Sequence, residues 1–140
     1  MLARIRKARE EREGGFTLIE LLVVIIIIGI LAAIAIPVFL NQRKKGYDAQ
    51  SQADLRNLAT LEETYLTDNP TSYATALSQL QATGYDFKQS ANSGTITVTA
   101  VANTSFKLQA VNGSSGHTWC YDSTGATGSG VFKAAGATCT

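Results

Sequence analysis

The residues of this sequence that could carry chemistry are few, and the most unusual is a single glutamate. Glu20 follows the stretch Gly14-Gly15-Phe16-Thr17-Leu18-Ile19 and directly precedes twenty residues without a charge, Leu21 to Leu40. A carboxylate well inside a membrane is costly and is a functional candidate for that reason, whereas one at the headgroup level costs little. The position of Glu20 alone leaves both interpretations open.

The other candidate residues point away from catalysis. His117 is the one histidine, expected in a turn, and the sequence has no nucleophile–base pairing, phosphate loop or carboxylate cluster. We therefore predict no catalytic residue and no cofactor. Cys120 and Cys139 lack CxxC spacing and a histidine at ligand spacing, which disfavours a metal site. In an extracytoplasmic domain such a pair predicts a disulfide, and the lone acid of the C-terminal part, Asp122, disfavours a calcium site.

The uncharged run predicts a membrane-spanning helix. Twenty residues form a helix of about 30 Å, the thickness of a bilayer core. A secretory signal has a shorter apolar part followed by small residues, whereas Gly14 and Gly15 precede this run. Five basic residues lie before it and three lie after it, Arg43, Lys44 and Lys45. This asymmetry favours a cytoplasmic N-terminus and an external C-terminal part.

The rest of the chain predicts one small domain. The 140 residues include twelve basic and eleven acidic ones, and this near-neutral balance argues against nucleic acid as a partner. No strong stop signal follows Pro37, and apolar residues then largely keep helical spacing. They are Ala49, Ala53, Leu55, Leu58, Leu61, Tyr65 and Leu66, with Arg56, Glu62 and Glu63 between them. A single helix over 16–66, about 77 Å long, and a short helix over 74–83 are expected.

Beyond residue 94 apolar and polar residues alternate, so the spacing of apolar residues changes to two. Alternation over 95–101 and 105–111 predicts two strands joined by a turn around Asn103, and 118–121 and 131–133 are expected to be the third and fourth strands. The fold class is α+β, with the long helix packed against a small four-stranded antiparallel sheet. Phe106 and Trp119 are expected in its core. Asn103 and Asn112 begin matches to the N-glycosylation pattern, which is frequent by chance.

The N-terminal residues carry a family resemblance. Gly14-Gly15-Phe16-Thr17-Leu18-Ile19-Glu20, after a short basic leader and before an unbroken apolar helix, resembles the class III signal of type IV pilins and pseudopilins. The match covers residues 1 to about 66. It implies that a prepilin peptidase cuts after Gly15, removes the leader 1–15 and methylates the new amine of Phe16.

The resemblance also gives Glu20 a role. An α-amino group with a pKa near 8 is mostly protonated at neutral pH, and leaving one member of a buried ion pair unpaired is expensive. The family implies that Glu20 of an incoming subunit pairs with the Phe16 amine of a neighbour, which fixes the register of the packed helices. An intrachain pair is conceivable too, because the two residues share a helical face.

Two residues of the apolar run interrupt its regularity. Pro37 cannot donate a hydrogen bond to the Ala33 carbonyl, so a kink is expected there. Such a kink is common in membrane helices and needs no function. In pilins, the stretch that corresponds to Gly29–Pro37 can lose helicity on assembly, which would give the fibre elasticity.

Three functions remain open from the sequence. The leading one is a major type IV pilin, with segments 1–15 (leader), 16–40 (membrane and fibre core), 41–66 (amphipathic helix) and 67–140 (globular domain). Its implied partners are further copies of the chain, the prepilin peptidase, the membrane, and the pilus assembly platform with its ATPase. The chain would be a single-pass protein of the plasma membrane and then part of an extracellular fibre. The alternatives are a pseudopilin of a type II secretion or DNA-uptake system and, in a different class, a monomeric single-span anchor.

Overall fold

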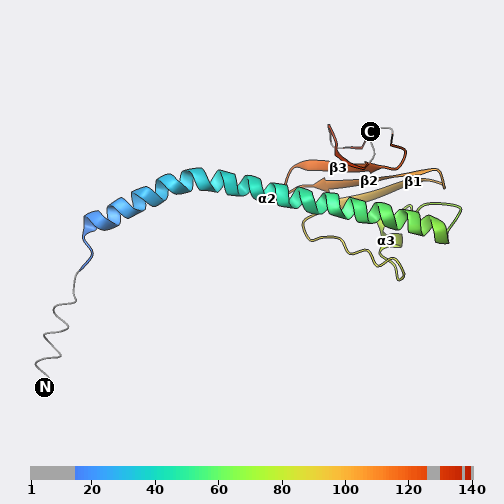
Figure 1. The fold of residues 1–140 in the computed structure, drawn as a ribbon, viewed down its shortest axis with the longest axis horizontal. Helices are drawn as coiled ribbons and strands as arrows, with labels where there is room; N and C mark the ends of the chain where they lie inside the picture. The colour runs from blue at the N-terminus through green and yellow to red at the C-terminus, as the bar shows by residue number, and fades with distance from the viewer. Residues whose placement is uncertain (1–14, 126–129, 137, 140) are drawn as a thin grey trace, which may run out of the picture. The chain divides into compact units, whose positions relative to one another are not determined.

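The computed structural model describes residues 15–125, 130–136, 138 and 139. The elements in chain order are α2 (Leu18–Asp68), α3 (Leu77–Leu80), β1 (Thr95–Val101), β2 (Ser105–Asn112), β3 (His117–Asp122) and β4 (Val131–Lys133) (Figure 1). The chain divides into two compact units, residues 1–40 and 41–140. Helix α2 begins in the first unit and ends in the second.

The described part of the first unit consists of residues 15–17 and the apolar part of α2. Isoleucine and valine are poor helix formers in water, but in lipid a helix satisfies every backbone group within the segment. The most apolar 18-residue window of α2 has a mean hydropathy of 3.3, and none of it is buried. Among the described residues this is the one helix long and apolar enough to cross a membrane. It continues through Gly29 and Pro37 without a break.

Helix α2 ends at Asp68, two residues beyond the predicted end. The Asn69 backbone N–H donates to the Tyr65 carbonyl at 2.8 Å, and the Asn69 side-chain amide donates to the same oxygen at 3.2 Å. Pro70 follows, and a proline disfavours helical backbone in the residue before it. The end of the helix is thus set by Asn69-Pro70, as the sequence indicates.

The four strands form one antiparallel sheet in the order β1-β2-β3-β4, the predicted meander. The bounds of β1 and β4 are those predicted, whereas β2 is longer by Asn112 and β3 by His117 and Asp122. Alternate residues of β1 and β2 are buried. Their inward side chains pack with Leu55 and Leu58 of α2 in one core, which confirms the α+β fold.

Phe106 lies in this core with 1% of its surface exposed. Trp119 is half-buried at the edge of the core, and both lie on the face of the sheet that packs on α2. The outer face of β3, which carries Cys120 and Asp122, is also buried. Asp122 there accepts hydrogen bonds from Thr124 and pairs with Lys107 at 3.4 Å.

The predicted helix over 74–83 is wrong in length, because α3 is a single turn. Residues before it are held in extended backbone: the Ala74 N–H donates to Glu62 at 2.8 Å, and the N–H groups of Thr75 and Ala76 donate to the Gln79 side chain. Side chains therefore take the donors that further helix would have used.

The predicted apolar stripe on α2 is also partly wrong. Ala49 and Ala53 are exposed. The face of α2 that meets the domain carries four buried polar residues besides its apolar ones: Asp48, Ser51, Asp54 and Glu62. A buried polar side chain is stable only when it is hydrogen-bonded, and each of these four bonds to a loop or strand of the domain.

Candidate processing and assembly site

The residues at the predicted cleavage point are accessible in the structure. Gly15, Phe16 and Thr17 precede the first turn of α2 in non-helical backbone. Phe16 is 93% exposed. A Cβ placed on Gly15 would meet no atom within 4 Å, so the fold itself does not require glycine at this position. The rest of the predicted leader lies outside the described residues.

Thr17 and Glu20 form a capping box at the start of α2. The backbone N–H and the hydroxyl of Thr17 donate to Glu20 Oε2 at 2.8 and 2.7 Å, and the Glu20 N–H donates to the Thr17 hydroxyl at 3.2 Å. These bonds satisfy N–H groups that have no partner within the helix. Thr-x-x-Glu before an apolar run is the sequence signature of this motif, and the motif gives Glu20 a structural role besides the predicted one.

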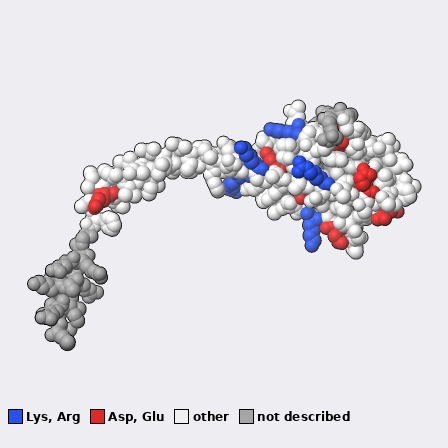
Figure 2. Space-filling model, viewed as in Figure 1, with Lys and Arg blue, Asp and Glu red and all other residues white. Residues whose placement is uncertain are grey.

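The capping box leaves Glu20 able to accept a further donor. Both Thr17 donors use Oε2, and Oε1 has no partner among residues 15–125. The carboxylate is solvent-exposed and is the only charge of residues 15–40. Figure 2 shows it as one acidic patch on an otherwise uncharged helix surface. A further hydrogen-bond donor, of the same or another copy, can therefore bind at Oε1 while the cap stays intact.

The apolar surface around Glu20 is continuous. Every residue from 16 to 40 except Ala32 is exposed in the isolated chain, and Leu18 and Ile34 are 83% and 67% exposed. Exposed apolar surface on this scale marks a membrane or protein contact. Gly29 lies within this surface and has nothing within 4 Å of its Cβ position. Helical flexibility at Gly29 and Pro37 stays a prediction.

In the second unit, Asp48 of α2 holds the first half of β3. Its Oδ2 lies 2.7 Å from His117 Nδ1, and its Oδ1 accepts from Trp119 Nε1 at 3.0 Å. Burial raises the pKa of Asp48, but hydrogen bonds from Ser115, Trp119 and His117 outweigh it and leave the pKa below its usual value. The prediction that His117 lies in a turn is wrong, because it opens β3 and its ring is bonded to the helix.

Asn112 cannot serve as a glycosylation site in the folded domain. It is 2% exposed, and its side-chain amide donates to Ser51 and to the carbonyls of Tyr47 and Asn92. Asn103 lies exposed in the turn between β1 and β2. Of the two matches to the glycosylation pattern, the structure leaves only that of Asn103 accessible.

The predicted position of Glu62, on the polar side of α2, is also wrong. Glu62 was expected between the apolar positions of α2, but it has no exposed surface, and only its Oε2 accepts a hydrogen bond, from Ala74 N–H. Burial raises its pKa from 4.5 to about 7; the Ala74 bond lowers it in part, and the neighbouring Glu63 raises it. The folded domain therefore keeps Glu62 protonated to a much higher pH than an exposed glutamate, up to about pH 7.

This raised pKa predicts a pH dependence of stability. Because the folded state binds this proton more tightly than the unfolded state, the contribution is complete below pH 4.5 and is lost as the pH rises through 7. The loss is about 3 kcal/mol. Glu62→Gln should abolish this slope between pH 5 and 8, measured by denaturant unfolding of the detergent-solubilised chain with Trp119 fluorescence. The exposed neighbour provides the control: Glu63→Gln should keep the slope, and an unchanged slope in Glu62→Gln would refute the assignment.

Cys120 and Cys139 are joined by a disulfide, with Cα atoms 5.7 Å apart. Cys120 is fully buried on β3, and the Cys139 N–H donates to the Gln109 side chain of β2 at 3.3 Å. The bond therefore fastens the end of the chain to the outer face of the sheet.

Loss of this disulfide should destabilise the domain. For a separation of 19 residues the loop-entropy model gives roughly 3 kcal/mol. Replacing both cysteines by serine should lower the free energy of unfolding by that amount and leave the helicity of residues 18–40 unchanged in detergent. Thiol labelling of the native, unreduced protein checks the premise, since two free thiols would contradict it.

The chain is similar to known proteins over part of its length. A family model described as the prokaryotic N-terminal methylation motif matches residues 12–36. The type IV major pilin protein PilA of Myxococcus xanthus is 42% identical over 57 residues, which are 41% of this chain and 26% of the relative. The type IV wide pilus major component PilA4 of Thermus thermophilus is 51% identical over 55 residues, 39% of this chain and 42% of the relative.

A second kind of relative matches to a similar extent. The type II secretion system core protein G of Klebsiella pneumoniae is 36% identical over 72 residues, which are 51% of each chain. The matched region thus spans between about a quarter and a half of the length of these relatives. Through its N-terminal methylation motif and the long helix that follows, packed on a four-stranded antiparallel sheet, the chain is similar to type IV major pilins and to the core protein G of type II secretion systems.

Proposed function

We propose that this chain is the structural subunit, a major pilin, of a type IV pilus. It is not an enzyme, and its relatives are structural subunits of pili or of the type II secretion system. In the proposed sequence of events, a prepilin peptidase cuts after Gly15 and methylates Phe16. The processed subunit is held in the plasma membrane, which residues 16–40 span. It then enters a helical homopolymer that an assembly platform and its ATPase build.

The observation that carries the proposal is the carboxylate on an exposed apolar helix, next to an accessible glycine. A helix that only anchors a monomer needs neither Glu20 nor Gly15, because the fold does not use the glycine and a glutamine could form the same capping box. A fibre subunit needs both, because the proposed peptidase cuts after Gly15, and because apolar contacts in the fibre core do not set axial register while a buried ion pair does. The monomeric anchor is therefore disfavoured.

A pseudopilin is the second candidate, favoured by the matches to core protein G. The higher identity to the two major pilins supports the pilin assignment. Deletion of the gene separates them: loss of sheared surface fibres in electron micrographs, with secretion intact, supports the major pilin. Loss of secretion with fibres unchanged would contradict the major pilin and support the pseudopilin. If neither fibres nor secretion changed, the monomeric anchor would be supported.

A further inference from the structure

The exposed charges of the second unit are almost all without an ionic partner. Among the residues that the structure describes, the one pair between a lysine or arginine and a carboxylate is Lys107–Asp122. The basic residues near the start of the unit, Arg43, Lys44 and Lys45, are exposed and make no such pair. Neither do Glu63 and Asp68, exposed in the last two turns of α2.

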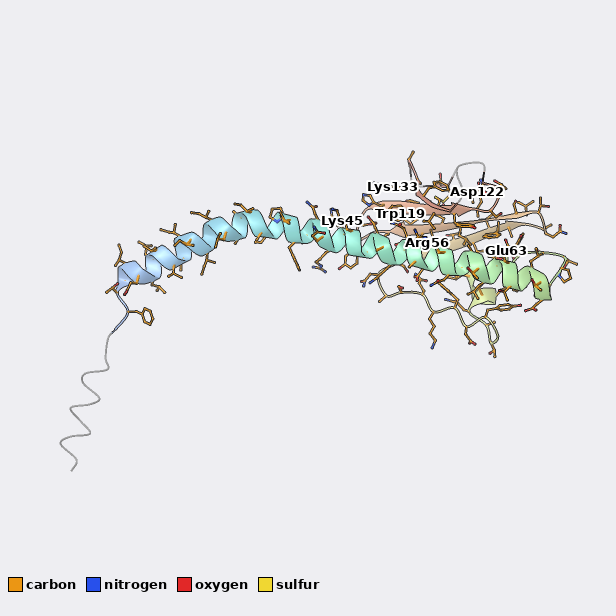
Figure 3. All side chains as sticks on the ribbon, in the orientation of Figure 1. Lys45, Arg56, Glu63, Trp119, Asp122 and Lys133 are labelled. Atoms are coloured by element: carbon orange, nitrogen blue, oxygen red, sulfur yellow. A yellow bond between two sulfur atoms is a disulfide. The ribbon has the colours of Figure 1, made fainter. Side chains whose placement is uncertain are left out.

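These charges are segregated along the helix. Lys45 and Glu63 are 18 positions apart, which is about five turns and about 27 Å at the usual helical rise. Figure 3 shows Lys45, Arg56 and Glu63 in a row along one side of α2. Arg43 and Asp68 are 25 positions apart, about seven turns, so they too share a side of the helix. Each pair is too far apart to neutralise itself within one chain.

The two sides are arranged as a head-to-tail contact requires. With about 100° per residue, Lys45 and Glu63 lie on one flank of the face buried against the sheet, and Arg43 and Asp68 lie on the other. Each flank thus has a cation near the start of the second unit and an acid near the C-terminal end of α2, and the flank of Lys45 and Glu63 also carries the exposed Arg56 two turns before Glu63. In a heterologous interface one flank of a subunit meets the opposite flank of the next. A neighbour displaced by 23 positions brings its Asp68 to Lys45, and a neighbour displaced by 20 positions in the opposite sense brings its Arg43 to Glu63.

Local structure positions the acids but does not explain their charge. The Tyr73 hydroxyl donates to Glu63 at 3.3 Å, and the Tyr85 hydroxyl donates to Asp68 Oδ2 at 2.9 Å. Carboxylates at a helix C-terminus oppose the helix dipole, and the last turn of α2 has no basic residue. A neutral acceptor would serve the tyrosines equally well, so the negative charge points to a partner outside the chain.

We propose that the basic end of the second-unit part of α2 (Arg43, Lys44 and Lys45) pairs with the acidic end (Glu63 and Asp68) of a second copy of this chain. The second copy is parallel and displaced along the helix axis by about 20 to 23 residues, or about 30 to 35 Å. The inference rests on the proposed assembly into fibres and adds to it a contact outside the apolar core. Anionic lipid headgroups could also attract the basic end, but they would leave the acidic end without a role.

Charge reversal and its rescue test the contact. A basic-end variant (R43E, K44E and K45E) and an acidic-end variant (E63K and D68K) each place like charges together, which costs several kcal/mol in an interface. Each should reduce the fibre yield at least about tenfold at equal amounts of processed monomer. The chain carrying all five substitutions restores opposite charges and should recover fibres to within about threefold of wild type.

The controls separate this inference from the proposed function. Lys133→Glu reverses an exposed charge on β4, outside α2, and should leave the yield unchanged. Should E63K and D68K impair folding, E63Q and D68N keep acceptors for the two tyrosines and should still weaken the fibres. The proposed contact would be overturned by normal fibre yields in both reversal variants. It would also be overturned if the chain with all five substitutions stayed defective. Absence of fibres from the wild-type chain would instead overturn the proposed function.

Discussion

Glu20→Ala should leave a processed subunit that accumulates in the membrane and hardly enters fibres. The substitution removes the one charge of the apolar helix, so insertion is retained and even eased. In the fibre core it would leave the Phe16 ammonium without a partner, and breaking a buried pair is strongly unfavourable. Because the cost recurs at every subunit addition, we expect the fibre yield to fall below about a hundredth of wild type. Fibre and membrane fractions quantified by immunoblotting measure this.

The capping box makes two further variants necessary. Glu20→Gln keeps an acceptor at the third helical position for the Thr17 donors but has no charge, so it should fail to assemble as Glu20→Ala does. Thr17→Ala removes the hydroxyl from the cap and keeps the carboxylate, so it should still assemble. If Glu20→Gln makes fibres at normal abundance, the carboxylate serves the helix start and not the register of subunits.

Gly15→Leu should block processing, and the full-length precursor should remain in the membrane. The structure places no atom near the Gly15 Cβ position, so a larger side chain does not disturb the chain's own fold. The obstacle would lie in the peptidase site, which the resemblance implies must accept a small residue. Discrimination against added carbon atoms is roughly tenfold to two-hundredfold in rate, which immunoblotting for the precursor detects.

The matched control for processing is Gly15→Ala. It adds a single methyl group and should be cut at a reduced but measurable rate. Normal cleavage of Gly15→Leu would show that the small residue is not required and that the cut lies elsewhere.

Sequence predicts best those parts of the fold in which apolar and polar residues follow one regular spacing along the chain. Alternation of two in 95–101 gave β1 with the observed bounds, and Asn69-Pro70 marked the helix end to within two residues. Sequence also predicted Gly15, Phe16 and Glu20 as site residues. The structure places all three within one accessible stretch, and their roles stay predictions.

The parts that sequence missed depend on contacts distant along the chain. Glu62 and Asp48 are charged residues with the helical spacing of a buried face, and nothing local shows that Ala74 N–H and the His117 and Trp119 rings meet them. Assigning polar residues to the solvent side is a sound average rule, and it fails here because loops and strands supply the hydrogen bonds. The disulfide pairing was accessible to the sequence because only two cysteines exist.

The most direct test of the account is the intact mass of the subunit recovered from sheared fibres. We predict one species that begins at Phe16, carries one methyl group on its α-amine and retains the Cys120–Cys139 disulfide. A subunit that begins at Met1, or sheared fibres in which this chain is absent, would contradict the central claim that the chain is processed at Gly15 and polymerises through its exposed helix.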